Sequence, residues 1–593
     1  MKTPTRPELA GTFGMVASTH WLASAAGMAE LEAGGNAFDA VVAAGFVLQV
    51  VEPHLNGTGG EVPVIFARPG DEPTVLCGQG PAPAAATIAH FRDLGYRLIP
   101  GAGPLAAAVP GAVEAWLTLL RDHGTRRLAQ VLSYAVGYAE RGHPLLPRVV
   151  TTIARVADLF RQDWTTSADV YLPGGAPPRS GALFANPALA RTYRRLIAAE
   201  AAAPGGRENG LDAARAAWRE GFVAEAIDAF ARRPFRHPDG GRHPGLVTGA
   251  DLASFTATYE RPAVHPFRDV QVCKTAAWGQ GPVLLQQLAL LNGFDDAALD
   301  TGTAIGVHHV VEAAKLAFAD REAWYGDAME PPLASLLAPH YTSRRRRLIG
   351  GRASRELRPG DPEGRLARLP HHLSTAGSGP ASLDGALGEP TVQPSGLTAG
   401  DTCHVDVVDR WGNMVSATPS GGWLQSSPVI PDLGFPLGSR LQMCWLEEGL
   451  PASLVPGRRP RTTLSPTLVL RDGVAVLACG TPGGDQQDQW QTAFLLAHLV
   501  GGLDLQSAVE APAWHTMAVP SSFHPRQARP GEIVVEGRIG RDVLAALARR
   551  GHEIVVAGDW ELGRLSAVSR DPGSGLLRAA ADPRSRQGYV AGR

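Results

Sequence analysis

Apolar and polar residues alternate from Thr402 to Asp409, and this period of two predicts a β-strand with one buried face. Trp411-Gly412-Asn413 then predicts a turn, and Met414 to Thr418 is typical of the returning strand of a hairpin. The preceding segment, about residues 351–400, is rich in Pro, Gly, Ser, Arg and Ala without periodicity, so we expect a flexible linker there. A buried strand that starts directly after a linker is explained if Thr402 becomes a new N-terminus.

A threonine at such a terminus has a specific chemistry. Its hydroxyl is a weak nucleophile until a base removes the proton, and the free α-amine of the same residue, with an unperturbed pKa of about 8, can be that base. Cleavage of the Asp401–Thr402 bond would therefore turn Thr402 into an N-terminal nucleophile. The alternative is an ordinary strand threonine.

The region before the linker shows the periodicity of layered helices and strands. Its final helix carries His308 and His309 near the start. Because there is no HExxH spacing and no third ligand is placed, we interpret both as helix-surface histidines and expect no metal site. Helices are predicted at 22–32, 37–50, 105–120, 128–140, 187–201, 211–231, 283–291 and 304–323, and strands at 14–19, 62–67 and 264–274.

Two turns in the last third of the chain carry candidate chemistry. Residues 461–466 form a hydroxyl-rich turn that includes Thr462 and Thr463. Residues 479–485 end a strand in a Gly483-Gly484 turn, which leads into a helix predicted at 489–500. Two successive N–H groups at a glycine turn can form an oxyanion hole, and the positive end of the helix dipole adds to the effect.

Composition narrows the class of protein. The chain has 593 residues, 44% of them hydrophobic and 19% charged, so it can bury a large core. A net charge of −2 gives no electrostatic reason for binding nucleic acid or a membrane. Five scattered cysteines without a CxxC pair argue against disulfides and for a reducing compartment. Without an apolar signal region or a run of 18 apolar residues, we expect a soluble, cytoplasmic protein.

Taken together, these features resemble the gamma-glutamyltransferase family of N-terminal-nucleophile hydrolases, over nearly the whole chain. The most specific matches are Asp401-Thr402-Cys403-His404, Val408 to Asn413 and Gly480-Thr481-Pro482-Gly483-Gly484. The resemblance implies an α+β fold of four layers, αββα, with two central sheets between helices. It also implies that residues 1–401 and 402–593 are separated by self-cleavage and remain together as one structural unit, a heterodimer of the chain's own fragments.

The same resemblance assigns roles by matching positions. Thr402 would be the nucleophile and Ser420 the hydroxyl that supports its activation. Gly483 and Gly484 would be the oxyanion donors, and Thr462 and Thr463 would lie near the substrate. All of these are protein groups, so no cofactor and no metal is implied.

The departures from the family pattern concern the substrate. Family members that act on γ-glutamyl compounds hold the α-carboxylate and α-amine with an arginine, an asparagine, a glutamine and an aspartate. The matching positions here are Gln79, Gly422, Arg440 and Met443. Met443 replaces the aspartate that would pair with the substrate's ammonium group. Gln79 replaces the arginine that would form two hydrogen bonds to the substrate's carboxylate. The chain therefore looks more like the branch that includes oxamate amidohydrolase, with Arg440 as a candidate for binding a small acidic acyl group.

Three rival classes of enzyme do not fit the sequence. A cysteine hydrolase built on Cys403 and His404 fails because adjacent strand residues point to opposite faces. A serine hydrolase lacks the G-x-S-x-G elbow, and a nucleotide-binding enzyme lacks the glycine and lysine spacings.

Two alternatives stay open beside the amidase. One is a non-catalytic binding homologue. The other is a secondary-metabolism enzyme that uses the same acyl chemistry to cleave a C–C bond beside a keto group. Each of these would take a small-molecule substrate or ligand, and a homo-oligomer is also left open.

Overall fold

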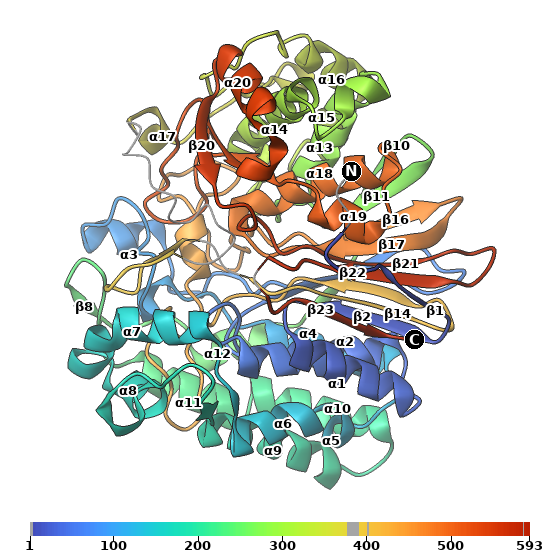
Figure 1. The fold of residues 1–593 in the computed structure, drawn as a ribbon. Helices are drawn as coiled ribbons and strands as arrows, with labels where there is room; N and C mark the ends of the chain where they lie inside the picture. The colour runs from blue at the N-terminus through green and yellow to red at the C-terminus, as the bar shows by residue number, and fades with distance from the viewer. Residues whose placement is uncertain (1–3, 376–390, 400–401, 585) are drawn as a thin grey trace.

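The structure, a computed structural model, describes residues 4–375, 391–399, 402–584 and 586–593. Two seven-stranded sheets lie face to face with helices on both outer sides, which confirms the predicted αββα layers (Figure 1). The outer helices next to the sheets are α1 (Trp21–Glu32), α2 (Ala37–Val51) and α4 (Ala112–His123) on one side, and α13 (Pro282–Leu291), α14 (Ala304–Trp324) and α18 (Gln487–Leu499) on the other.

The first sheet contains the predicted hairpin, β14 (Val405–Asp409) and β15 (Met414–Ala417). The hairpin is inserted between two strands from near the start of the chain, so Val407 pairs with Val16 on one side and Ser416 pairs with Ile65 on the other. The full order is β23 (Tyr589–Gly592), β2 (Gly14–Ser18), β14, β15, β3 (Val62–Ala67), β4 (Thr74–Gly78) and β9 (Thr258–Glu260).

The second sheet is also antiparallel and also mixes both parts of the chain. Its order is β1 (Leu9–Gly11), β22 (Leu577–Ala581), β21 (Ser566–Arg570), β17 (Val474–Gly480), β16 (Thr467–Arg471), β11 (Val270–Lys274) and β10 (Ala263–Phe267).

Both faces of β14 are buried, whereas the sequence predicted one buried face. Val408 faces the second sheet and packs with Leu468 and Val568. Val405 and Val407 face the helices and belong to the core that includes α2. The prediction was too narrow because it did not include the helix layer that covers the sheet's outer face.

Several predicted elements begin later or are split. The helix predicted from residue 105 begins only at Ala112, since Pro110-Gly111 interrupts it. The helix predicted at 211–231 is two helices, α10 (Arg207–Arg219) and α11 (Phe222–Ala231), with Gly221 between them. The strand predicted at 264–274 is the β10–β11 hairpin, which turns at Arg268 with a φ of 52°.

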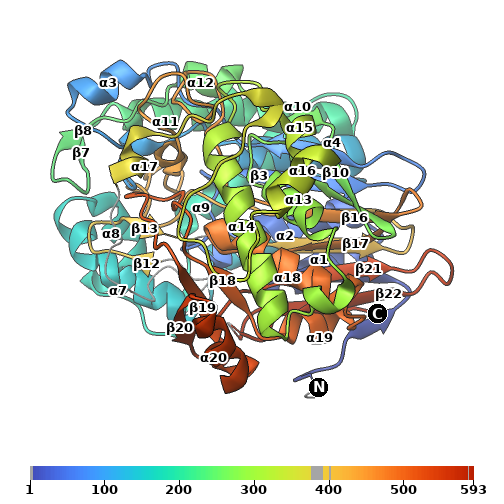
Figure 2. The same cartoon turned by 90° about the horizontal axis from the view of Figure 1, so that it is seen from above.

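The remaining elements surround this sandwich (Figure 2). They are α3 (Ile88–Asp93), α5 (Leu128–Val131), α6 (Ser133–Arg141), α7 (Pro147–Gln162), α8 (Thr165–Tyr171), α9 (Pro187–Ala202), α12 (Gly249–Ser254), α15 (Leu333–Leu337), α16 (Pro339–Arg346), α17 (His371–Thr375), α19 (Leu505–Glu510) and α20 (Arg541–Arg549), the strand pairs β5 (His143–Pro144) with β6 (Leu183–Phe184), β7 (Phe235–Arg236) with β8 (Arg242–His243) and β12 (Thr391–Val392) with β13 (Thr398–Ala399), and a small sheet of β18 (Trp514–Thr516), β19 (Glu532–Glu536) and β20 (Glu553–Ala557).

The start of the predicted linker is attached to the body of the protein. The N–H of Ala353 donates to the Arg550 carbonyl at 2.8 Å, and Lys315 donates to the Ser354 carbonyl at 2.9 Å. Further along, the indole of Trp324 donates to the Gly360 carbonyl at 3.1 Å. The rest of the predicted linker lies partly outside the described residues, at 376–390 and 400–401.

His308 is buried and not on the helix surface as predicted. The α20–β20 unit covers this side of α14, and His552 from that unit lies 2.9 Å from His308. All five cysteines are buried free thiols, as expected without disulfides. Within the described ranges, none of the helices combines the length and the apolar character needed to cross a membrane.

Candidate active site

Thr402 is a fully buried residue just before β14. Its backbone N–H donates to the Leu55 carbonyl at 3.2 Å, and its Oγ1 donates to Ser420 Oγ at 3.3 Å. Its φ is 102°, which is rare for a β-branched residue and costs of order 1–3 kcal/mol. The predicted nucleophile and its predicted supporting hydroxyl are therefore in contact, and the backbone is strained at the bond that we expect to be cut.

The loop after α2 holds the residue next to the nucleophile. Glu52 is fully buried and accepts hydrogen bonds from Thr19 Oγ1 at 2.6 Å and from Cys403 Sγ at 3.1 Å. Gln587 also donates to this carboxylate. Burial and the Glu52 charge raise the pKa of the Cys403 thiol well above its usual range, so Cys403 stays a neutral thiol.

His404 has partners of its own on the other side of the strand. Its Nε2 lies 2.8 Å from Asp406 Oδ1, and its Nδ1 lies 2.9 Å from Thr418 Oγ1. Cys403 and His404 therefore have separate partners, which argues against a cysteine–histidine pair.

Ser420 connects the nucleophile to a buried ion pair that sequence reasoning did not find. Arg440 donates from Nη2 to Ser420 Oγ at 3.0 Å and from Nε to Glu61 Oε1 at 2.6 Å. The Arg440 guanidinium also lies 5.8 Å from the centre of the Trp423 ring. Arg440 was predicted to bind a substrate carboxylate, and the structure shows that it already has a carboxylate partner inside the protein. The available signal was an acidic residue, Glu61, that directly follows the Gly59-Gly60 turn.

Met443 contributes an apolar surface to the same region. Its sulfur lies 3.5 Å from Arg440 Nη1, and its side chain packs with Trp423 and Phe523. A thioether is a weak acceptor and cannot compensate an ammonium group.

The Gly483-Gly484 turn follows the end of β17, across the sandwich from His404. The φ values of Gly483 and Gly484 are 119° and 57°. A Cβ on Gly480 would come within 2.2 Å of the His404 ring, and a Cβ on Gly483 within 2.4 Å of Trp490. Neither N–H of the glycine pair donates to an acceptor in the described part of the chain. Both groups thus remain candidate oxyanion donors.

Asp485 anchors this turn. Ser522 donates to the Asp485 carboxylate from its N–H at 2.7 Å and from its hydroxyl at 2.6 Å, and Arg321 forms a buried ion pair with it. Burial alone would raise the pKa of Asp485, but Arg321 and Ser522 more than offset this, so the pKa is lowered. The anionic carboxylate holds the turn in place.

The other predicted substrate residues are buried around the same end of the sandwich. The backbone of Thr462 pairs with Gly279, and its N–H donates to the Trp278 carbonyl at 3.2 Å. The Thr463 hydroxyl is buried without a partner among the described residues. The Gln79 amide donates to the Gly80 carbonyl at 3.1 Å. Within the described part of the chain, no hydrogen bond joins Gln79, Thr462 or Thr463 to Thr402, so their roles remain predictions.

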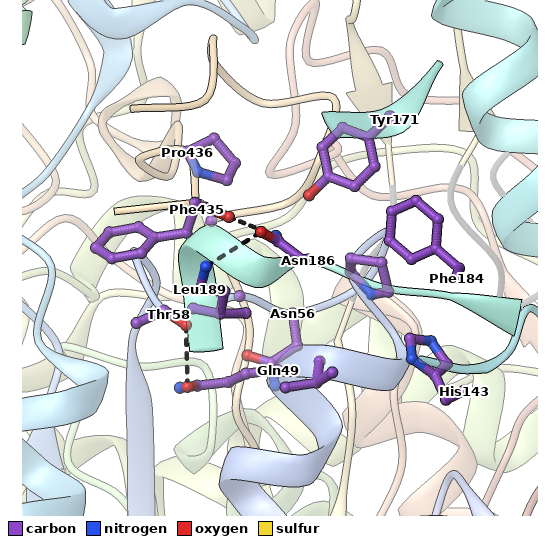
Figure 3. Close-up of a pocket in the computed structure, with 15 residues that line it drawn as sticks. Gln49, Asn56, Thr58, His143, Tyr171, Phe184, Asn186, Leu189, Phe435 and Pro436 are labelled. Atoms are coloured by element: carbon purple, nitrogen blue, oxygen red, sulfur yellow. Dashed lines mark hydrogen bonds between the residues drawn. The ribbon is translucent and has the colours of Figure 1, made fainter. Parts of the chain in front are cut away.

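Gly422, the fourth matching position, lines a small cavity. Figure 3 labels other residues that line the same cavity, among them Asn56 and Tyr171. The φ of Gly422 is 64°, and a Cβ on Gly57 would lie 2.0 Å from the Gly422 carbonyl, so the two loops pack backbone to backbone. The cavity volume is about 20 Å³, which suits one water molecule and is far below the size of a substrate pocket. Thr402 is not among the residues that line it.

One cluster away from this site has the residue types of a metal centre. His308, Glu312 and His552 place one ligand atom each within 4.8 Å of the others. However, Glu312 also pairs with Lys315 at 2.7 Å and lies 3.4 Å from Arg358. Two cations already surround the carboxylate, which disfavours a third, and we interpret the cluster as a structural network.

Comparison with known proteins agrees with this fold. Residues 23–592 match the family described as gamma-glutamyltranspeptidase. The chain belongs to this family and is an N-terminal-nucleophile hydrolase by its relatives and fold.

Three individual proteins are informative. The oxamate amidohydrolase proenzyme of Klebsiella pneumoniae is 30% identical, over 98% of both chains. The solved structure of LmbA2991T421A is 59% identical with a TM-score of 0.95 and covers 100% of both chains. The cephalosporin acylase from Bacillus halodurans is 27% identical with a TM-score of 0.82, over 100% of this chain and 97% of that one.

Proposed function

We propose that this chain cleaves its own Asp401–Thr402 bond and then uses Thr402 to hydrolyse or transfer an acyl group. The observation that carries the proposal is the arrangement at Thr402. Its nitrogen is oriented by the Leu55 carbonyl and its hydroxyl by Ser420, in a buried position. A nucleophile whose base is its own amine needs both atoms fixed in this way.

In the processing step, the Thr402 hydroxyl adds to the carbonyl carbon of Asp401. The C–N bond breaks, the nitrogen takes up the hydroxyl proton, and an ester joins the two residues. Water then hydrolyses the ester, which leaves an Asp401 carboxylate and a free Thr402 amine.

In each turnover, the α-amine accepts the proton of the Thr402 hydroxyl while Oγ1 attacks the acyl carbon. The N–H groups of Gly483 and Gly484 stabilise the resulting oxyanion in this proposal. When the intermediate collapses, the α-ammonium returns the proton to the leaving amine. Water or an amine then attacks the acyl-enzyme ester through the same base.

The substrate that we propose is an amide of a small acidic acyl group, not a γ-glutamyl compound. Met443 and Gln79 cannot pair the two charges of a glutamyl group, and unpaired buried charges are strongly rejected. Arg440 supports an acidic acyl group because its guanidinium, a group that pairs well with carboxylates, donates to Ser420 beside the proposed nucleophile. The oxamate amidohydrolase among the relatives gives further support.

Trapping of the acyl-enzyme tests this proposal. The processed enzyme is mixed with N-succinyl-4-nitroanilide, quenched in acid within the first turnover and analysed by mass spectrometry. We expect a succinyl group on the first residue of the smaller fragment. Acylation at any other residue would contradict the assignment. Activity only on a β-keto acid that releases a carbon leaving group would favour the C–C cleavage alternative with the same nucleophile.

A further inference from the structure

Glu61 is the acidic partner of Arg440 next to the candidate nucleophile. Both side chains are almost completely buried, at 4% and 2% exposure. Arg440 contacts the Glu61 carboxylate through Nε at 2.6 Å and also through Nη2. Each charge compensates the other where solvent is excluded, so the ion pair is polar but has no net charge.

The backbone fixes Glu61 directly opposite Ser420. The Glu61 N–H donates to the Ser420 carbonyl at 2.8 Å, and the Ser420 N–H donates to the Glu61 carbonyl at 3.0 Å. Gly421 provides the space, since a Cβ there would lie 2.6 Å from Glu61 Oε2. The carboxylate, the guanidinium and the Ser420 hydroxyl therefore form one connected unit that ends at Thr402.

We infer that Glu61 is a specificity-determining residue, which sets the charge that Arg440 presents to the acyl group and holds Arg440 against Ser420. This inference rests on the proposed function. When Glu61 is ionised, its carboxylate compensates the positive charge of Arg440, and the guanidinium still donates hydrogen bonds in fixed directions. An acyl carboxylate then gains hydrogen bonds from Arg440 but is repelled by Glu61, so neutral polar acyl groups compete with acidic ones.

The two roles of Glu61 can be separated by substitution. Glu61→Gln keeps an oxygen that can accept from Arg440 Nε and removes the charge. Glu61→Ala removes both. A residue that only positions Arg440 would tolerate glutamine without a change in charge selectivity. A residue that sets the charge would change this selectivity in the glutamine variant.

The test compares two substrates that differ only in charge, N-succinyl-4-nitroanilide and its terminal carboxamide. For each enzyme the measured quantity is the ratio of kcat/KM for the carboxylate to that for the carboxamide. We expect Glu61→Gln to raise this ratio on the order of 10- to 100-fold, as removal of one charge a few ångströms from the carboxylate implies at protein dielectric values. Arg440→Gln should lower the ratio.

A matched control is Glu114→Gln. Glu114 is another buried glutamate, in α4, and it pairs with Arg215 of α10 at 2.6 Å. This variant should leave the ratio within about twofold of the starting enzyme. An unchanged ratio in Glu61→Gln with normal processing would overturn the inference and leave the Thr402 mechanism intact.

A binding measurement tests the charge selectivity of the same site without catalysis. Calorimetry with succinate and succinamate, the two free acids, should show that Glu61→Gln favours succinate relative to the unsubstituted enzyme. If neither anilide were hydrolysed, the proposed function would fail, and this measurement would still decide the role of Glu61. If Glu61→Gln and the unsubstituted enzyme preferred succinate over succinamate to the same degree, the inferred role of Glu61 would be contradicted.

Discussion

The backbone nitrogen of Thr402 lies 3.2 Å from the carbonyl oxygen of Leu55. A carbonyl can only accept, so this contact orients one N–H of the amide before cleavage and can orient one N–H of the amine after it. The lone pair of the amine is then directed away from Leu55. The base that the proposed mechanism needs is thus prepared by the loop that follows α2.

The first prediction is self-cleavage between Asp401 and Thr402. Dividing the 62.4 kDa of the chain in proportion to 401 and 192 residues gives fragments of about 42 and 20 kDa on a denaturing gel. Thr402→Ala should remain one band and be inactive, because it lacks the attacking hydroxyl. Thr402→Ser, which keeps the hydroxyl, is the control and should be cut. Complete processing of the alanine variant would contradict the mechanism.

The second prediction concerns the Gly483-Gly484 turn. Gly483→Ala should lower kcat on the order of 100-fold, because the new Cβ at 2.4 Å from Trp490 and the φ of 119° force the donors to move. KM should change much less. Adding Trp490→Leu should recover part of the loss by relieving the contact. Steady-state kinetics on N-succinyl-4-nitroanilide give kcat and KM for the single and the double variant. A wild-type kcat in Gly483→Ala would show that the turn has only a structural role.

The third prediction is that the processed enzyme has negligible activity on γ-glutamyl-4-nitroanilide and on glutathione. Met443 and Gln79 leave an ammonium and a carboxylate unpaired in the pocket, which can cost several orders of magnitude in kcat/KM. Release of nitroaniline and of glutamate gives the readout. Rapid γ-glutamyl transfer would show that the matching of these positions to the family is wrong.

The fourth prediction is that Glu52, which holds the residue next to the proposed nucleophile, stabilises the folded chain. Glu52→Ala should lower the free energy of unfolding by about 3–5 kcal/mol, since it removes the buried carboxylate that Thr19 and Cys403 share and that lies 3.9 Å from Arg564. Cys403→Ala, which removes only one weak donor to this carboxylate, should cost much less. Denaturant unfolding of the unprocessed Thr402→Ala chain compares the two without interference from cleavage.

The fifth prediction is a loss of stability in acid. Burial lowers the pKa of His515 to about 3, while the unfolded group titrates near 6.5. The unfolded chain therefore binds more protons between these values, so stability is retained above pH 6.5 and falls as the pH drops towards 3, by about 1.4 kcal/mol per pH unit for this group.

His515→Phe should make the dependence of the urea midpoint on pH less steep in this window. His340→Gln, which changes an exposed histidine, should not. An equally steep dependence in the phenylalanine variant would assign the acid sensitivity to other groups.

The hairpin after residue 402 could be predicted because it depends on local periodicity, and the four layers could be predicted from the resemblance to the family, whose motifs are short and continuous in the chain. The exact helix starts could not be, since Pro110-Gly111 and Gly221 interrupt patterns that remain apolar on both sides. The role of Arg440 also could not be predicted in full. Its partner Glu61 is 379 residues away in sequence, and only the pairing of two distant loops brings them together.

The position of His308 shows the same limitation. A helix that is polar on one side is normally exposed there, but here a separate unit near the C-terminus supplies His552 as a buried partner. When a segment distant in sequence packs over the polar face of a helix, the local sequence pattern of that helix does not indicate it.

The strand order has a consequence for the two fragments that the proposed cleavage would produce. β14 and β15 lie inside a sheet between β2 and β3, while β1 pairs with β22 and β23 pairs with β2. Strands from before and after residue 402 are interleaved in both sheets, so the two fragments of the proposed cleavage could separate only if both sheets unfolded. Specific activity should therefore not fall on dilution, and cells that express two variants together should contain no mixed pairs.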